Sequence, residues 1–90
     1  MGSRRNRNEI IYDILDALAQ NNGQLKPTRL LYKANMSHSQ MKEYIGELSE
    51  KSLLELVEDK SKQYYRLTNT GYEFFHNLRK IREMSDALGL

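Results

Sequence analysis

The sequence predicts a mainly helical α+β fold in which three helices are followed by a β-hairpin and a last helix. Apolar residues recur at helical spacing in the first half of the chain and again near its end. Between these segments, residues 54–67 contain two short β-like runs on either side of a charged turn. Thr68 follows the second run and can cap a helix with its hydroxyl, so a strand is expected to lead directly into a helix.

The composition fits one small domain that lacks the residues of the commonest reactive sites. The chain has 90 residues, a net charge of +2, no cysteine and two histidines, His38 and His76. Disulfides and thiolate metal sites are therefore excluded, and no metal site or other cofactor is expected. No apolar run approaches the length of a membrane span, so a cytoplasmic protein is predicted. Because no nucleophile, general base or phosphate-binding loop accompanies the acidic residues, we expect no enzyme activity.

A first helix is predicted over residues 9–20, after a flexible basic arm over residues 1–8. Asn8 is the expected N-cap, and Glu9 adds favourable negative charge in the first turn. Asn21, Asn22 and Gly23 are expected to end the helix. Its apolar face consists of Ile10, Ile11, Ile14, Leu15 and Leu18.

Two further helices are predicted to be joined by a turn of a few residues. Pro27 suits the first position of the second helix, and Gln24 and Leu25 before it are expected to bridge to a sheet edge. Asn35 tolerates the left-handed conformation that ends a helix. Ser37 and Gln40 then have the spacing of a capping box for a third helix, predicted over residues 38–51. Two helices joined this closely form a helix-turn-helix.

The hairpin and the segment after it resemble the corresponding part of winged helix-turn-helix domains. The strands are expected at residues 54–57 and 64–67, with the charged residues 58–62 at the tip. The resemblance rests on Leu67-Thr68-x-x-Gly71, on the helix exit Lys51-Ser52-Leu53-Leu54 and on the order of the elements. Such proteins usually have glycine where Ser52 stands, so a positive φ is expected at this serine.

The third helix is expected to direct Met41, Tyr44, Ile45 and Leu48 inward, which turns the opposite face outward. In a helix-turn-helix, this outer face enters a DNA major groove. The acidic residues Glu43, Glu47 and Glu50 favour the alternative of an ordinary solvated face, because they repel phosphate. The residues expected to contact DNA, from the arm, the second and third helices and the wing, are Arg4, Arg5, Arg7, Lys26, Thr28, Arg29, Ser37, His38, Ser39, Gln40, Lys42, Glu43, Lys60, Lys62 and Arg66.

The last helix, predicted from Tyr72 to about Leu88, belongs to a C-terminal segment over residues 71–90. Phe74, Phe75 and Leu78 are expected to pack on the core of the domain. The remaining apolar residues project beyond that core and are expected to be buried by a second copy. The predicted dimer interface, spaced as a seven-residue repeat, comprises Phe74, Leu78, Ile81, Met84, Ser85 and Leu88.

The sequence resembles small archaeal winged-helix DNA-binding proteins, whose C-terminal helices pair as an antiparallel coiled coil. The matching segments are Glu9-Ile10-Ile11-Tyr12-Asp13-Ile14-Leu15 and Thr28-Arg29-Leu30-Leu31-Tyr32-Lys33-Ala34-Asn35. The resemblance implies a homodimer that binds double-stranded DNA in the cytoplasm, associated with the nucleoid, as a transcriptional regulator or an architectural protein without a cofactor. The alternative is a winged-helix module for protein–protein interaction that does not bind DNA.

Overall fold

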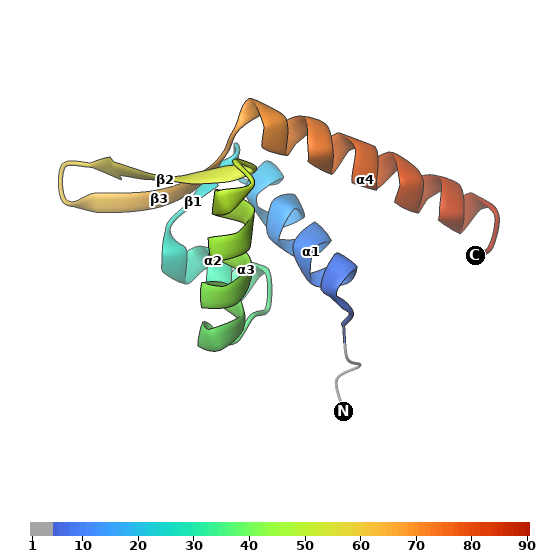
Figure 1. The fold of residues 1–90 in the computed structure, drawn as a ribbon, viewed down its shortest axis with the longest axis horizontal. Coiled ribbons are helices and arrows are strands. Elements are labelled where there is room, and N and C mark those ends of the chain that lie inside the picture. Colours follow the sequence, from blue (N-terminus) through green and yellow to red (C-terminus); the bar gives the residue numbers. More distant parts are fainter. Residues whose placement is uncertain (1–4) are drawn as a thin grey trace.

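The computed structural model describes residues 5–90 and shows four helices and one three-stranded antiparallel sheet in that part of the chain. The order of the elements is the predicted one, and the hairpin and the last helix extend to opposite sides of the domain (Figure 1). Among these residues, no helix has the combination of length and apolar character that crossing a membrane requires. The elements are α1 (Arg7–Ala19), β1 (Gln24–Leu25), α2 (Pro27–Lys33), α3 (His38–Glu50), β2 (Leu54–Asp59), β3 (Lys62–Leu67) and α4 (Asn69–Ala87).

Helix α1 begins earlier than predicted, because its cap is Asn6 and not Asn8. The Asn6 side chain accepts a hydrogen bond from the Glu9 amide at 2.8 Å, and the Glu9 carboxylate accepts one from the Asn6 amide at 2.9 Å. This capping box satisfies two amide groups at once, whereas a cap at Asn8 would leave Glu9 without its reciprocal bond. Arg7 and Asn8 therefore belong to the helix and not to the predicted arm.

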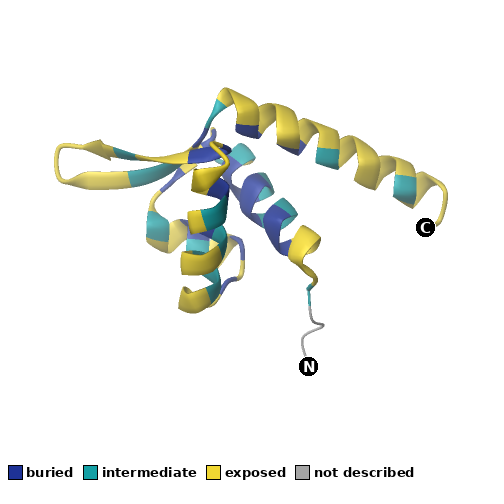
Figure 2. Ribbon diagram, in the orientation of Figure 1, coloured by how far each residue is buried: buried dark blue, intermediate teal, exposed yellow. Residues whose placement is uncertain are grey.

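The hydrophobic core lies around α1, which packs against α2, α4 and strands β1 and β3. In Figure 2 the buried residues gather along α1 and at the base of the sheet, whereas most of the hairpin and of α4 is exposed. Complete burial of a leucine or isoleucine side chain contributes about 1.5–3 kcal/mol. The largest fully buried side chains are Ile14, Leu15, Leu18, Leu30, Leu48 and Leu54.

The sheet has the order β1-β3-β2, which confirms the predicted bridge of Gln24 and Leu25 to a sheet edge. The hairpin strands are longer than predicted, since the pairing of β2 with β3 runs on to Asp59 opposite Lys62. Only Lys60 and Ser61 are left for the turn. Lys60 has φ of 51°, as tight two-residue hairpin turns require.

A dense joint connects the end of α3 to the start of α4. Ser52 has φ of 60°, which confirms the positive φ expected at this serine. The Thr68 hydroxyl donates to the Ser52 carbonyl at 2.6 Å and accepts from the Gly71 amide at 2.9 Å, which confirms the predicted cap. A Cβ atom on Gly71 would lie 1.9 Å from the Leu53 carbonyl oxygen, so glycine is required here. Because Thr68 is the cap, α4 starts at Asn69 and not at Tyr72.

Helix α4 is attached to the domain only over part of its length. Phe75 is buried and packs against Tyr12 with 5.4 Å between ring centroids, and Leu78 is half-buried against the core. The prediction that Phe74 packs on the core is wrong, since it is 39% exposed. Phe74 instead lines an open hollow beside Ile11, Leu48 and Leu53, so its ring is only partly covered.

Candidate nucleic-acid interface

The first part of the helix-turn-helix lies in a stretch of sequence without acidic residues. No aspartate or glutamate occurs from Ala17 to Lys42, which includes all of α2 and the first part of α3. Four basic side chains are exposed on these two helices and on the residue that precedes α2, namely Lys26, Arg29, Lys33 and Lys42. Within residues 5–90, none of the four forms an ion pair. The helix-turn-helix as far as Lys42 therefore presents unpaired positive charge.

The two faces of α3 divide as predicted. Ile45 and Leu48 are buried, and Met41 and Tyr44 pack beside them, whereas the opposite face is exposed. The exposed face carries Ser39, Lys42, Glu43 and Gly46.

Two residues that were predicted to contact DNA, Ser37 and Gln40, form the N-terminal cap of α3. The Ser37 hydroxyl accepts from the Gln40 amide, and the Gln40 side-chain oxygen accepts from the Ser37 amide, each at 3.1 Å. The expected capping box is thus confirmed. His38, the first residue of the helix, is exposed beside this cap.

Gly46 stands on the exposed face without a packing requirement for glycine. A Cβ atom added to it would meet no other atom within 4 Å, in contrast to Gly71. Glycine inside a helix costs about 0.5–1 kcal/mol relative to alanine. The helix therefore carries a destabilising residue on the face that would enter a groove, where the missing side chain permits close approach.

The acidic residues of α3 differ in their surroundings. Glu47 pairs with Arg7 of α1 and with Lys51 at 3.3 Å, and its side chain is only 24% exposed. The Arg7 guanidinium also lies 5.8 Å from the centre of the Tyr44 ring. The negative charge of Glu47 is therefore balanced within the protein, and Arg7 is bound to α3.

Arg5 is likewise held by the fold. Its guanidinium donates to Asp13 at 2.8 Å, to the Ala34 carbonyl at 2.7 Å and to the Asn35 carbonyl. Cations interact favourably with carbonyl groups at the end of a helix, here the end of α2. The predicted contact residue Arg4 lies outside the described residues. The arm side chains that the structure describes thus fasten α1 to the helix-turn-helix.

The wing is electrically balanced. Residues 54–67 contain three acidic and three basic residues, so their charges cancel. Arg66 donates two hydrogen bonds to Glu55, at 2.9 and 3.2 Å, because these residues stand opposite each other in β3 and β2. Lys62 is paired in register with Asp59. The wing has less free positive charge than its lysine-rich tip indicates in the sequence.

Tyr32 is a surface residue that sequence reasoning did not select. It is 75% exposed on α2, one turn after Thr28 and next to Lys33. Two features of the sequence could have identified Tyr32 as a candidate contact residue. It lies outside the buried stripe of α2, and the residues around it are rich in basic side chains. A phenol hydroxyl can donate to a phosphate oxygen.

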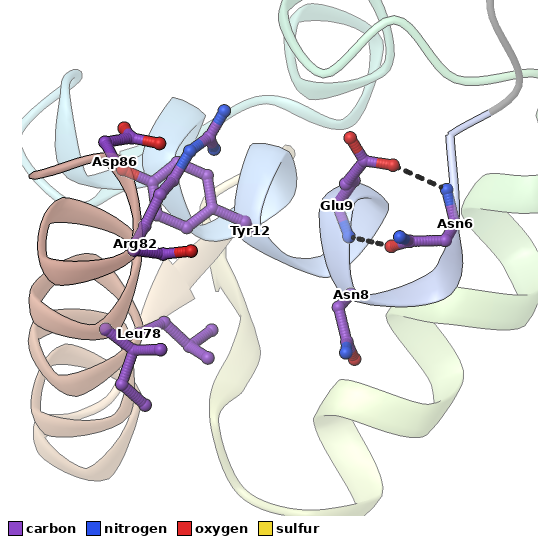
Figure 3. Close-up of a pocket in the computed structure, with 9 residues that line it drawn as sticks. Asn6, Asn8, Glu9, Tyr12, Leu78, Arg82 and Asp86 are labelled. Carbon is purple, nitrogen blue, oxygen red and sulfur yellow. Dashed lines mark hydrogen bonds between the residues drawn. The ribbon is translucent and has the colours of Figure 1, made fainter. Parts of the chain in front are cut away.

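An open cleft of about 470 Å³ separates the start of α1 from the second half of α4. Figure 3 shows Arg82 next to Tyr12, with the guanidinium 4.4 Å from the ring centre. The other residues that line the cleft are Asn6, Asn8, Glu9, Leu78, Ile81, Ser85 and Asp86. Leu78, Ile81 and Ser85 also belong to the predicted dimer interface, so the cleft and that interface share part of one surface.

The fold and this arrangement of charge define a class of protein. The family model described as winged helix-turn-helix matches residues 4–86, and the chain therefore belongs to this family. No curated protein matches the sequence.

Several solved structures share the fold. The chain is 20% identical to Sso10a-2, a DNA-binding protein from Sulfolobus solfataricus, with a TM-score of 0.79 over 93% of this chain and 85% of that one. It is 21% identical to a winged-helix DNA-binding protein from STIV, with a TM-score of 0.79 over 88% of this chain and 92% of that one. It also matches the PcaV transcriptional regulator from Streptomyces coelicolor, at 23% identity and a TM-score of 0.76, over 87% of this chain and 60% of that one.

Proposed function

We propose that the protein binds double-stranded DNA, as a transcriptional regulator or an architectural protein of the nucleoid in the cytoplasm. The observation that carries this proposal is the acid-free stretch from Ala17 to Lys42, which covers α2 and the start of α3 and exposes four unpaired basic side chains. A duplex presents two phosphate charges for each base pair, and basic side chains that meet them release bound counterions. Membership of the winged helix-turn-helix family supports a role that is not catalytic.

In this proposal α3 lies in the major groove, and its exposed face meets the base edges. Ser39, Lys42 and Glu43 are on that face, and Gly46 allows the helix backbone to approach. Lys26, Thr28 and Arg29 contact phosphates on one side of the groove. On the flank, Lys60 and Lys62 at the tip of the wing contact backbone without sequence selectivity. Sso10a-2 and the STIV protein, which share the fold, are both described as DNA-binding.

The free part of α4 supports a homodimer in the same proposal. Ile81, Met84 and Leu88 are 63%, 64% and 71% exposed, although they are apolar and spaced for a helical seam. A second copy of α4 offers the same spacing and would cover both this seam and the neighbouring cleft. A twofold dimer would present two α3 helices to the duplex.

Two measurements test the proposal. The affinity for random and genomic duplexes should fall as salt rises, with a slope of log K against log salt of about −3 to −4 if four cations neutralise phosphates. No binding at low salt, or a slope near zero, would contradict DNA binding and favour the protein-interaction module. Ile81→Lys should convert a dimer to a monomer in analytical ultracentrifugation, while an unchanged mass would refute the α4 interface.

A further inference from the structure

We propose that Glu43 selects the bound sequence by accepting a hydrogen bond from the amino group of a cytosine in the major groove. The inference rests on the proposed function, since it requires α3 to lie in that groove. Glu43 is exposed on the outer face of α3, one turn after Ser39. Within residues 5–90 its carboxylate forms no ion pair and no side-chain hydrogen bond.

The surroundings of Glu43 distinguish it from the other acidic residues of α3. Glu47 is balanced by Arg7 and Lys51 on the flank of the helix. Glu50 is exposed at the last position of α3, two turns further along and away from the helix start that leads into a groove. Glu43 is thus the acidic residue that docking would bring to the bases.

A carboxylate in this position opposes binding unless it meets a hydrogen-bond donor. The phosphates on both sides of the groove repel it, and the acceptor atoms of guanine and thymine repel it as well. Amino groups of cytosine and adenine are the donors in the major groove. Adenine's amino group lies between N7 of the same base and O4 of thymine, both acceptors, whereas the cytosine amino group has an acceptor on one side only. Cytosine is therefore the base that fits Glu43.

The shape and charge of the neighbouring positions support close approach at this point. Gly46 lies one turn beyond Glu43, and the space beside it is open. Lys42 precedes Glu43 on the same exposed face and can bond to guanine or to a phosphate. A face that combines a lysine, a carboxylate and a bare glycine has the elements needed to read a C·G pair with the backbone close to the base edges.

The test compares Glu43→Gln with the wild-type dimer and with Glu50→Gln, which removes a charge from the same helix outside the proposed contact. Binding sites are selected from randomised duplexes, and affinities for the selected duplex and its single-base variants are measured at fixed salt. The wild type should require cytosine at one position, with a loss of about tenfold on replacement. Glu43→Gln should bind random duplex several-fold more tightly and should change the preference at that position from cytosine to adenine, which glutamine recognises. Glu50→Gln should keep the cytosine preference.

Two results would overturn the inference. One is an unchanged base preference in Glu43→Gln, and the other is a set of wild-type sites without a required cytosine. If the wild type binds no duplex at low salt, the proposed function itself fails, so the two failures are distinguishable. Glu43 is exposed and unpaired in the described structure, so Glu43→Gln should fold, and equal thermal midpoints for the two variants would verify this.

Discussion

Helix α2 and the wing each expose basic side chains, but only in the wing do acidic residues stand opposite some of them in the structure. In the wing, Arg66 stands opposite Glu55 and forms an ion pair with it, and Lys62 stands opposite Asp59. On α2, neighbouring positions along the exposed face carry no acidic residue at all. Net charge over a segment, taken with the pairing that its secondary structure imposes, therefore describes a binding surface better than a count of lysines.

Charge reversal on α2 should have the largest effect. Arg29→Glu combined with Lys33→Glu removes two unpaired cations and adds two repelling charges, so duplex affinity should fall by a factor on the order of 100. The slope of log K against log salt should become shallower by about two. Both measurements use a salt-titrated binding assay. A loss below about threefold would place DNA on another surface.

Charge reversal at the tip of the wing should have a smaller effect. Lys60→Glu combined with Lys62→Glu should weaken duplex binding by about tenfold, because Lys62 already faces Asp59. Side-by-side titration with the α2 variant makes the comparison direct. If the wing variant loses more affinity than the α2 variant, the assignment of the main electrostatic contact to the helix-turn-helix is wrong.

Gly46→Ala should weaken DNA binding by several-fold while it stabilises the fold. The added methyl group meets open space in the free protein, so the free energy of unfolding should rise by about 0.5–1 kcal/mol. Gly71→Ala is the matched control in α4, and its methyl group would collide with the Leu53 carbonyl, at a cost of about 2 kcal/mol. Thermal unfolding and duplex affinity together check this prediction. Unchanged affinity in Gly46→Ala would show that α3 does not approach the bases closely.

Neutralisation of Arg66 should have the smallest effect. Because Arg66 donates both of its observed side-chain bonds to Glu55, Arg66→Gln should change duplex affinity by about twofold or less. Glu55→Gln, which frees Arg66, should instead tighten binding modestly. The same binding assay measures both variants, and a tenfold loss in Arg66→Gln would show that this arginine leaves Glu55 to contact DNA.

Local patterns in the sequence predicted most of the fold. The caps at Ser37 and Thr68 and the apolar faces of α1 and α3 depend on residues near each other in the chain, and the structure confirms them. The structure also confirms the short bridge at Gln24 and Leu25, although its partners Arg66 and Tyr65 are distant in the chain. The start of α1 was misplaced, since Asn6 and Asn8 both suit a cap and only the bond from Glu9 separates them.

The charge balance of the candidate site depended instead on contacts between distant segments. Arg5 reaches the end of α2, and Arg7 reaches Glu47 on α3, across intervals that no spacing rule connects. The partner of Arg66 follows from the strand register, because Glu55 stands directly opposite it in β2. The sequence itself shows that no acidic residue occurs from Ala17 to Lys42. This pattern indicates where basic side chains remain unpaired.

The joint formed by Ser52, Thr68 and Gly71 has a consequence for the spacing of the two DNA half-sites that a dimer would bind. Its hydrogen bonds and its close contact connect the end of α3, which would contact the bases, to the start of α4, which would contact the second copy. The distance between the two α3 helices of a dimer would then depend on the structure of each chain, and the dimer interface would not need to flex. Half-sites in such proteins are spaced by about 34 Å, one turn of the double helix, or by multiples of it. A rigid joint of this kind would make the protein sensitive to the insertion of a few base pairs between half-sites, even when each half-site is intact.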